Sequence, residues 1–155
     1  MNNALVVNLN DWWQIFKHRE NHSLDKIDIH NYHYIVGPYF IKNCHWVAVI
    51  INIQTQTFQV IDPKGDSAAL SQQCKDSWVQ YYNRRHDIKI EKWNNNTKIQ
   101  HPVQTTQDNH NCGVFVCLLI EHYAKENGTI NFKSGKKDLK MFRDQIAKTL
   151  ENNKA

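Results

Sequence analysis

The chain has 155 residues, of which 41% are hydrophobic and 22% charged, and a formal net charge of +4 with its nine histidines counted as neutral. This composition is that of an ordinary globular protein and excludes a disordered or fibrous chain. The length favours a single domain over residues 1–155, which can bury a stable core without a metal or a disulfide.

The basic residues are spread along the chain. The nearest to clusters are Arg84 with Arg85 and the lysines within residues 133–140, which we interpret as solvated faces and not as the basic face of a nucleic-acid binder. The longest apolar runs, residues 46–51 and 114–120, are far shorter than the roughly 20 residues of a membrane span. The first residues also lack the parts of a secretory signal. We therefore expect a soluble intracellular monomer, in cytoplasm or nucleus or in a host cytosol if it is an effector, with neither nucleic acid nor membrane as a partner.

Element signals are weak in the first forty residues. Residues 11–17 are typical of a short helix. Residues 33–41 favour a strand, which we expect Gly37 and Pro38 to interrupt.

A hairpin is predicted next. Residues 41–53 contain a run rich in β-branched residues, which indicates a buried central strand. Residues 54–56 form the turn, and residues 57–62 alternate as the return strand. Pro63 ends that strand because proline cannot donate to the ladder.

A helix is expected to begin after Asp66 or Ser67, since either side chain can cap it. Four large residues recur at helical spacing on one face: Leu70, Cys74, Trp78 and Tyr81. Residues 86–93 alternate and predict a half-buried strand, followed by a polar loop over residues 94–111.

Two helices complete the chain. Residues 112–125 are long and apolar enough for a buried helix, which Asn127 and Gly128 would end. Residues 137–150 form the last helix, with one apolar stripe made of Leu139, Phe142, Ile146 and Leu150. The sum is an α+β layered fold.

Cys112 is the first candidate for chemistry. It stands at the start of the apolar helix, where partial positive charge and unpaired N–H groups favour a thiolate. Gly113 lets another backbone approach closely at that point. Cys117 lies inside the apolar run and is expected to fill the core. Without an export signal, the four cysteines are not expected to form a disulfide framework.

A reactive thiol needs a base and a group that orients the base. His45 begins the central strand and Asp62 ends the return strand. With the turn centred near Gln54, His45 faces roughly Pro63 and Asp62 faces roughly Trp46. Because opposite residues of an antiparallel pair have Cβ atoms roughly 5 Å apart, the hairpin brings the imidazole and the carboxylate together. We expect Asp62 to accept the imidazole Nδ1–H and fix the tautomer.

An oxyanion hole would complete this arrangement. The backbone N–H of Cys112 can supply one donor. A side-chain amide from the preceding loop would supply the second, and Gln107 and Gln104 are both candidates.

Three short segments resemble a known family. Residues 107–117, Gln-Asp-Asn-His-Asn-Cys-Gly-Val-Phe-Val-Cys, resemble the nucleophile motif of the ubiquitin-like protein-specific cysteine proteases, the SUMO protease family, which is distantly related to the adenovirus proteinase. Residues 45–50, His-Trp-Val-Ala-Val-Ile, resemble its histidine motif, and residues 60–63, Val-Ile-Asp-Pro, its aspartate motif. The resemblance covers residues 33–125.

The resemblance implies a papain-like cysteine protease core, with a central mixed or antiparallel sheet flanked by helices and the nucleophile at the N-terminus of a buried helix. Cys112 would be the nucleophile and His45 the general base, with Asp62 orienting His45 and Gln107 completing the oxyanion hole. The activity implied is cleavage after the C-terminal Gly-Gly of ubiquitin or a ubiquitin-like modifier, such as SUMO or a Nedd-type modifier, by a single catalytic domain.

The resemblance also implies substrate-binding residues. Trp46 would cover the narrow channel that admits the di-glycine tail, beside Gly113, and Trp13 would belong to a substrate-facing N-terminal portion. Two positions depart from the family's pattern. Its glutamine commonly lies six residues before the cysteine, where this chain has Thr106, and the residue before the cysteine is often Asp, where this chain has Asn111.

Other functions are less well supported. Some effectors of the same clan are acetyltransferases, but they need a regulatory cofactor site and a longer chain. A catalytically silent module that binds ubiquitin-like modifiers is disfavoured because all three triad residue types are present. A zinc site made of His101, His110 and Cys112 fits no standard spacing, so neither a metal nor another cofactor is expected.

Overall fold

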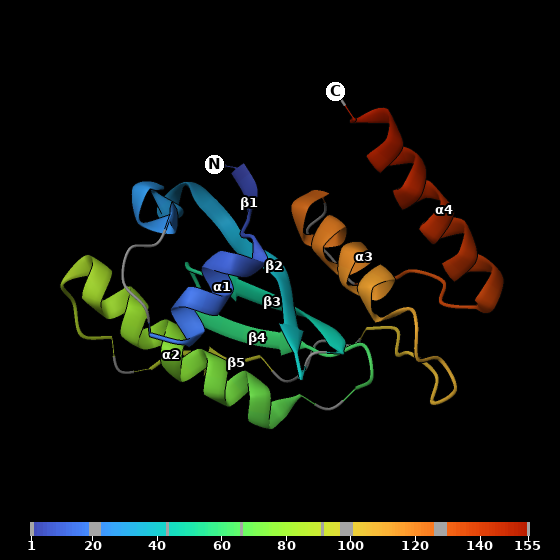
Figure 1. The fold of residues 1–155 in the computed structure, drawn as a ribbon. Helices are drawn as coiled ribbons and strands as arrows, with labels where there is room; N and C mark the ends of the chain where they lie inside the picture. Colours follow the sequence, from blue (N-terminus) through green and yellow to red (C-terminus); the bar gives the residue numbers. More distant parts are fainter. Residues whose placement is uncertain are drawn as a thin grey trace.

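A mixed β-sheet with helices on both faces forms the centre of the structure, a computed structural model (Figure 1). It describes residues 2–18, 23–42, 44–65, 67–90, 92–96, 101–125 and 130–154. Within them the strands lie side by side in chain order: β1 (Asn2–Val6), β2 (Tyr32–Ile41), β3 (His45–Asn52), β4 (Thr57–Ile61) and β5 (Asn94–Asn95). β1–β2 and β4–β5 are parallel pairs, and β2–β3 and β3–β4 are antiparallel.

The helices divide between the two faces of the sheet. They are α1 (Leu9–Phe16), α2 (Ala68–His86), α3 (Cys112–Lys125) and α4 (Lys136–Asn152), with short 3₁₀ turns at Ser23–Lys26 and Ile29–Asn31. α1 and α2 pack against the sheet through the core cluster that contains Trp12 and Trp78, and α3 packs through a separate cluster that contains Leu119. This architecture confirms the predicted α+β class.

The alternation of β3 explains how one strand serves both cores. Val47 and Val49 lie in the cluster with α1 and α2, whereas Ala48 and Ile50 lie in the cluster with α3. Successive side chains of a strand point to opposite faces, so a strand covered on both sides reads as a continuous apolar run. That run made β3 the clearest strand in the sequence.

The β3–β4 hairpin lies one residue out of the predicted register. Ala48 pairs with Ile61 and Asn52 pairs with Thr57, which places His45 one position beyond Pro63. The turn has four residues, not three, and Gln56 adopts a left-handed conformation with φ 50°. The extra residue moves the centre of the turn and hence the pairing.

β2 continues through Gly37 and Pro38, so the predicted interruption is wrong. The paired part of β1 ends opposite Val36, and Pro38 therefore lies where β2 has a strand neighbour on one side only. A β-carbon on Gly37 would clash with the Val7 carbonyl oxygen and with Trp12 Nε1. The glycine allows the N-terminal segment to cross close over β2.

The segment after α2 is not the predicted strand. α2 extends to His86, where Asp87 closes it in a left-handed conformation with φ 48°. The side chain of Asn83 then binds both the backbone N–H and the carbonyl oxygen of Ile90, at 3.1 Å each. These bonds take the backbone groups that a strand ladder would use. β5, by contrast, lies within the predicted loop.

The predicted helices are confirmed. α1 overlaps residues 11–17, α3 begins at Cys112 and ends at Lys125, and α4 extends the predicted span by one residue at its start and two at its end. On α2, Cys74, Trp78 and Tyr81 are buried as expected. The proposed stop at residues 127–128 and the cap at residue 66 lie outside the described residues. Within the described residues, no helix combines the length and apolar character needed to cross a membrane.

Candidate active site

The β3–β4 hairpin brings His45 and Asp62 into contact. His45 Nε2 lies 2.6 Å from Asp62 Oδ1, and the two side chains are 11% and 15% exposed. The backbone N–H of Lys64 donates to the same carboxylate oxygen at 2.8 Å, and the N–H of Gly65 donates to the Asp62 carbonyl at 2.9 Å. The tight turn after β4 therefore holds the carboxylate in place against the imidazole.

The imidazole nitrogen in this contact is Nε2 and not the expected Nδ1. The choice depends on how the ring rotates about its side-chain bonds, which strand pairing does not determine. With Nε2 bound to Asp62, Nδ1 is the nitrogen that remains to exchange a proton with another group.

Cys112 is the first residue of α3 and is 8% exposed. The carbonyl oxygen of Asn111 accepts the N–H of Phe115 at 3.0 Å, which makes Asn111 the cap residue of the helix. A β-carbon on Gly113 would lie 3.6 Å from Trp46 Cδ1. The start of α3 therefore lies close to Trp46, the residue that follows His45 in β3, and so near the end of the sheet where His45 contacts Asp62.

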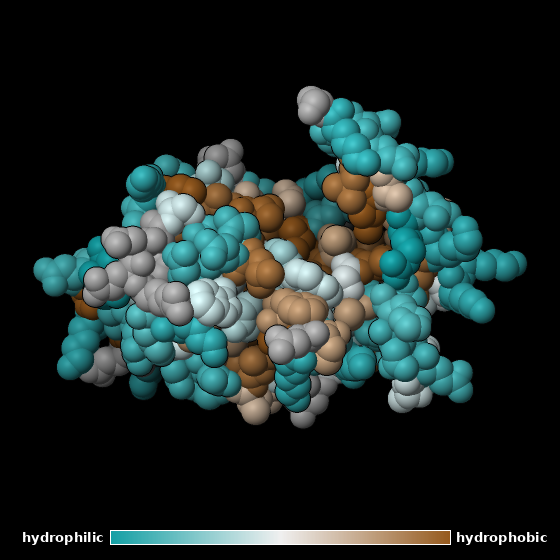
Figure 2. All heavy atoms as spheres, viewed as in Figure 1, coloured by the Kyte–Doolittle hydropathy of each residue, from teal (hydrophilic) through white to brown (hydrophobic). Residues whose placement is uncertain are grey.

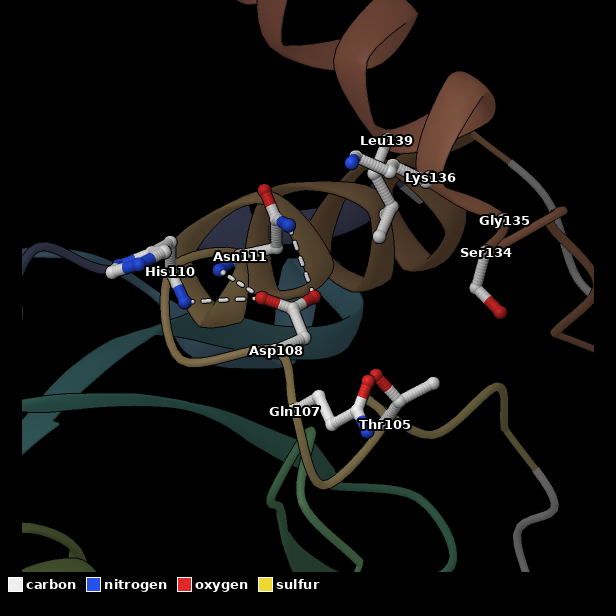
Figure 3. A pocket seen from close by; sticks show the side chains of 9 residues that line it. All are labelled: Thr105, Gln107, Asp108, His110, Asn111, Ser134, Gly135, Lys136 and Leu139. Carbon is white, nitrogen blue, oxygen red and sulfur yellow. Dashed lines mark hydrogen bonds between the residues drawn. The ribbon is translucent and has the colours of Figure 1, made fainter.

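A compact turn precedes Cys112. Asp108 accepts the backbone N–H groups of His110 at 3.0 Å and Asn111 at 3.1 Å, and the side-chain amide of Asn111 at 3.0 Å (Figure 3). Burial opposes the charge of Asp108, but these hydrogen bonds and one involving Gln104 outweigh it and lower the pKa of the carboxyl group. The charged carboxylate thus organises the residues that lead into α3.

The two candidate glutamines occupy different environments. Gln104 is 5% exposed, its backbone N–H donates to the Pro63 carbonyl at 2.6 Å, and its amide nitrogen donates to the Asp108 carbonyl. Its Oε1 is a buried atom without a hydrogen-bond partner. Gln107 is exposed and lines a surface pocket between the loop before Cys112 and the start of α4 (Figure 3).

The three predicted substrate-binding residues are also separated. Trp46 packs on Phe40, with ring centroids 4.7 Å apart, and lies beside Gly113. Trp13 is 39% exposed and belongs to α1, which contacts β2 and α2. The structure thus brings Trp46 and Gly113 together and places Trp13 in the helix layer on the other face of the sheet from α3.

Cys117 is exposed on α3, so its expected role as a core residue is wrong. The buried residues of the helix recur at helical spacing and leave Cys117 on the outer side: Cys112, Val114, Phe115, Val116, Leu119 and Tyr123. The apolar run is too continuous to reveal this face. All four cysteines are free thiols.

We expect Cys112 to react with chloroacetamide much faster than Cys74. Burial raises the pKa of the Cys74 thiol to about 12. Because the thiolate is the nucleophile, a higher pKa leaves less reactive sulfur near neutral pH. Time-resolved peptide mass spectrometry measures the order, with exposed Cys44 as the reference for an accessible thiol. Equal rates at Cys74 and Cys112 would contradict the proposed reactivity.

Fold and site together describe an α+β domain with a helix that begins at a cysteine, next to a histidine–aspartate pair at the end of a sheet, which is the general arrangement of papain-like cysteine peptidases. The chain belongs to the Ulp1 protease family: the profile of this family's C-terminal catalytic domain matches residues 6–154. No curated protein sequence matches the chain significantly.

Solved structures show the same fold. The C-terminal Ulp1 protease domain in complex with Smt3, the yeast ortholog of SUMO, has a TM-score of 0.75 and 19% identity over 94% of this chain and 66% of the other. The Chaetomium thermophilum Ulp1-like SUMO protease domain gives 0.66 and 19%, over 97% and 61%. The central domain of an uncharacterized Legionella pneumophila protein gives 0.58 and 19%, over 97% and 90%. The chain spans about two thirds of the length of the Ulp1 domains it matches.

Proposed function

We propose that this domain is a cysteine protease that cleaves after the C-terminal Gly-Gly of a ubiquitin-like modifier, with a SUMO-type modifier as the first candidate. The observation that carries the proposal is the 2.6 Å contact between His45 and Asp62 at the end of the sheet where the helix of Cys112 begins. Membership in the Ulp1 family and the likeness to a Ulp1 domain bound to Smt3 support the substrate class.

The residues supply each step of an acyl transfer. His45 accepts the Cys112 proton, and the thiolate attacks the carbonyl carbon of the terminal glycine. The tetrahedral oxyanion receives hydrogen bonds from the Cys112 backbone N–H and a side-chain amide. Protonated His45 then gives its proton to the leaving lysine amine, which breaks the C–N bond and leaves a thioester. Water, deprotonated by His45, hydrolyses the thioester and releases the modifier. Asp62 orients the imidazole and stabilises its charged form.

The approach to Cys112 suits a substrate tail without side chains. Trp46 lies close to Gly113, the residue after the nucleophile, and a β-carbon on Gly113 would fill the space between them, 3.6 Å from Trp46 Cδ1. A substrate tail that reaches Cys112 past these two residues has little room for a β-carbon. Glycine at the last two positions of the tail meets this restriction, which supports a Gly-Gly terminus as the recognised feature.

We assign the second oxyanion donor to Gln104, because it is buried next to Pro63, whereas Gln107 is exposed. Gln104→Ala is therefore expected to lower kcat by about 10²- to 10³-fold, which is the usual effect of losing one such donor. Gln107→Ala is the matched control and should change kcat little. A larger loss in Gln107→Ala, measured on the same substrate, would return the role to Gln107.

The function is tested with a panel of modifiers bearing an electrophilic group at the C-terminal glycine. Wild-type protein should form a covalent adduct with at least one of SUMO, ubiquitin or a Nedd-type modifier, and Cys112→Ala should form none. Binding without any adduct by the wild type would indicate a silent binding module. Turnover of acetyl-CoA without cleavage of conjugates would indicate the acetyltransferase.

A further inference from the structure

We propose that Arg143 on α4 is a positioning residue for the nucleophile Cys112. Arg143 Nη2 donates to the carbonyl oxygen of His110 at 2.9 Å and to Asn111 Oδ1 at 2.7 Å. These acceptors belong to the two residues that directly precede Cys112. The inference rests on the proposed function for its catalytic consequence, whereas the contact itself belongs to the fold.

Asn111 joins Arg143 to the turn before α3. Its Oδ1 accepts from Arg143, and its Nδ2 donates to Asp108 Oδ2 at 3.0 Å. An asparagine side chain has an acceptor and a donor and so can make both bonds at once. An aspartate in this position would keep the acceptor for Arg143 but would set a second carboxylate against Asp108. The link to Arg143 thus accounts for asparagine at a position where the family often has aspartate.

The same bonds determine how α3 begins. A cap asparagine normally uses its Oδ1 to accept N–H groups from the first turn of its own helix. Asn111 Oδ1 instead accepts from a residue of another helix. This arrangement fixes the orientation of the peptide that leads into Cys112 and leaves the first N–H groups of α3 to a ligand. In the proposed mechanism that ligand is the oxyanion of the substrate.

α4 is otherwise attached by an apolar strip. Leu139, Phe142 and Ile146 pack in one cluster with Val114 and Phe115 of α3. Beyond this strip the helix stands away from the body, and Figure 2 shows hydrophobic residues facing the hollow between them. Arg143 directly follows Phe142 and adds a polar contact between the packed part of α4 and the backbone before Cys112.

Arg143→Met keeps most of the side-chain volume and removes both hydrogen bonds. We expect this variant to lower kcat for cleavage of a Gly-Gly-linked modifier by about 10- to 100-fold, the loss that small misplacement of a catalytic group produces, with KM nearly unchanged. Arg143→Lys should recover part of kcat, because one ammonium reaches one of the two acceptors. Lys148→Met is the matched control, since Lys148 is an exposed basic residue of the same helix, and it should retain wild-type kcat.

Two further measurements do not depend on protease activity. In Arg143→Met, amide hydrogen exchange over residues 105–116 should accelerate, and chloroacetamide labelling of Cys112 should slow, while thermal unfolding stays close to that of Lys148→Met. Unchanged exchange and labelling would overturn the positioning role, as would unchanged kcat in an active protein. A wild-type protein that cleaves no modifier would refute the proposed function, and exchange and labelling would then still decide the role of Arg143.

Discussion

Cys112→Ala is expected to abolish turnover of modifier conjugates while preserving the fold and the affinity for the modifier. Removal of the nucleophile from a triad that works as a unit lowers kcat by roughly 10⁶-fold in a well-studied serine protease, and we expect a loss of similar scale here. The folded state should tolerate the change, because alanine is a strong helix former and close in size to cysteine. Conjugate cleavage followed on gels and modifier binding measured by calorimetry test the two halves of this prediction.

The other cysteines provide the controls for this experiment. Cys74 is a residue of α2 and packs in the core, and Cys117 lies on the outer side of α3. Cys117→Ala is expected to retain full activity, and Cys74→Ala should be active with somewhat lower stability because a buried side chain is shortened. Loss of catalysis in folded Cys117→Ala, with Cys112→Ala still active, would reverse the assignment of the nucleophile.

The sequence predicts the central hairpin and the helices because their patterns arise locally. A strand covered on both faces needs a continuous apolar run, and β3 has one. The helix of Cys112 begins where a polar loop ends and an apolar stretch starts, and this boundary predicts its first residue. These local patterns are sufficient to predict that His45 lies near Asp62, although the predicted register of the hairpin is wrong by one residue.

Elements that depend on distant partners were not predictable. β1 has five residues and forms a parallel pair with β2, although about thirty positions separate paired residues. β5 has only two residues, which is too short for any periodic pattern. The alternation of Ile88 and Ile90 suggested a strand, but the side chain of Asn83 holds that backbone by contacts no periodicity reveals.

The candidate site shows the same division. Residue types and their order indicate a thiol, an imidazole and a carboxylate at the ends of elements, and the structure confirms the contact of the last two. Whether Gln104 or Gln107 is the second oxyanion donor depends on which side chain the loop buries. In the sequence both are polar residues of the same loop, so no pattern distinguishes them. Arg143 gave no signal, because in sequence it is one more charged residue on an amphipathic helix, 31 positions after Cys112.

His45→Ala is expected to lower kcat by about 10⁴-fold, the upper range of what general acid–base catalysis contributes, because one imidazole serves both the attack and the protonation of the leaving amine. Asp62→Ala should cost less, since the imidazole remains but loses the bond that orients it. Asp62→Asn should cost least, because an amide oxygen can still accept the Nε2–H.

Single-turnover cleavage of a fluorogenic Gly-Gly-linked modifier measures this series, with His33→Ala on β2 as the control for loss of a histidine outside the site. Exogenous imidazole should restore part of the rate to His45→Ala and none to Cys112→Ala, because a small base can replace the proton carrier but not the nucleophile. If Asp62→Asn lost more activity than His45→Ala, the aspartate would have to act on the substrate itself and not through the imidazole it contacts.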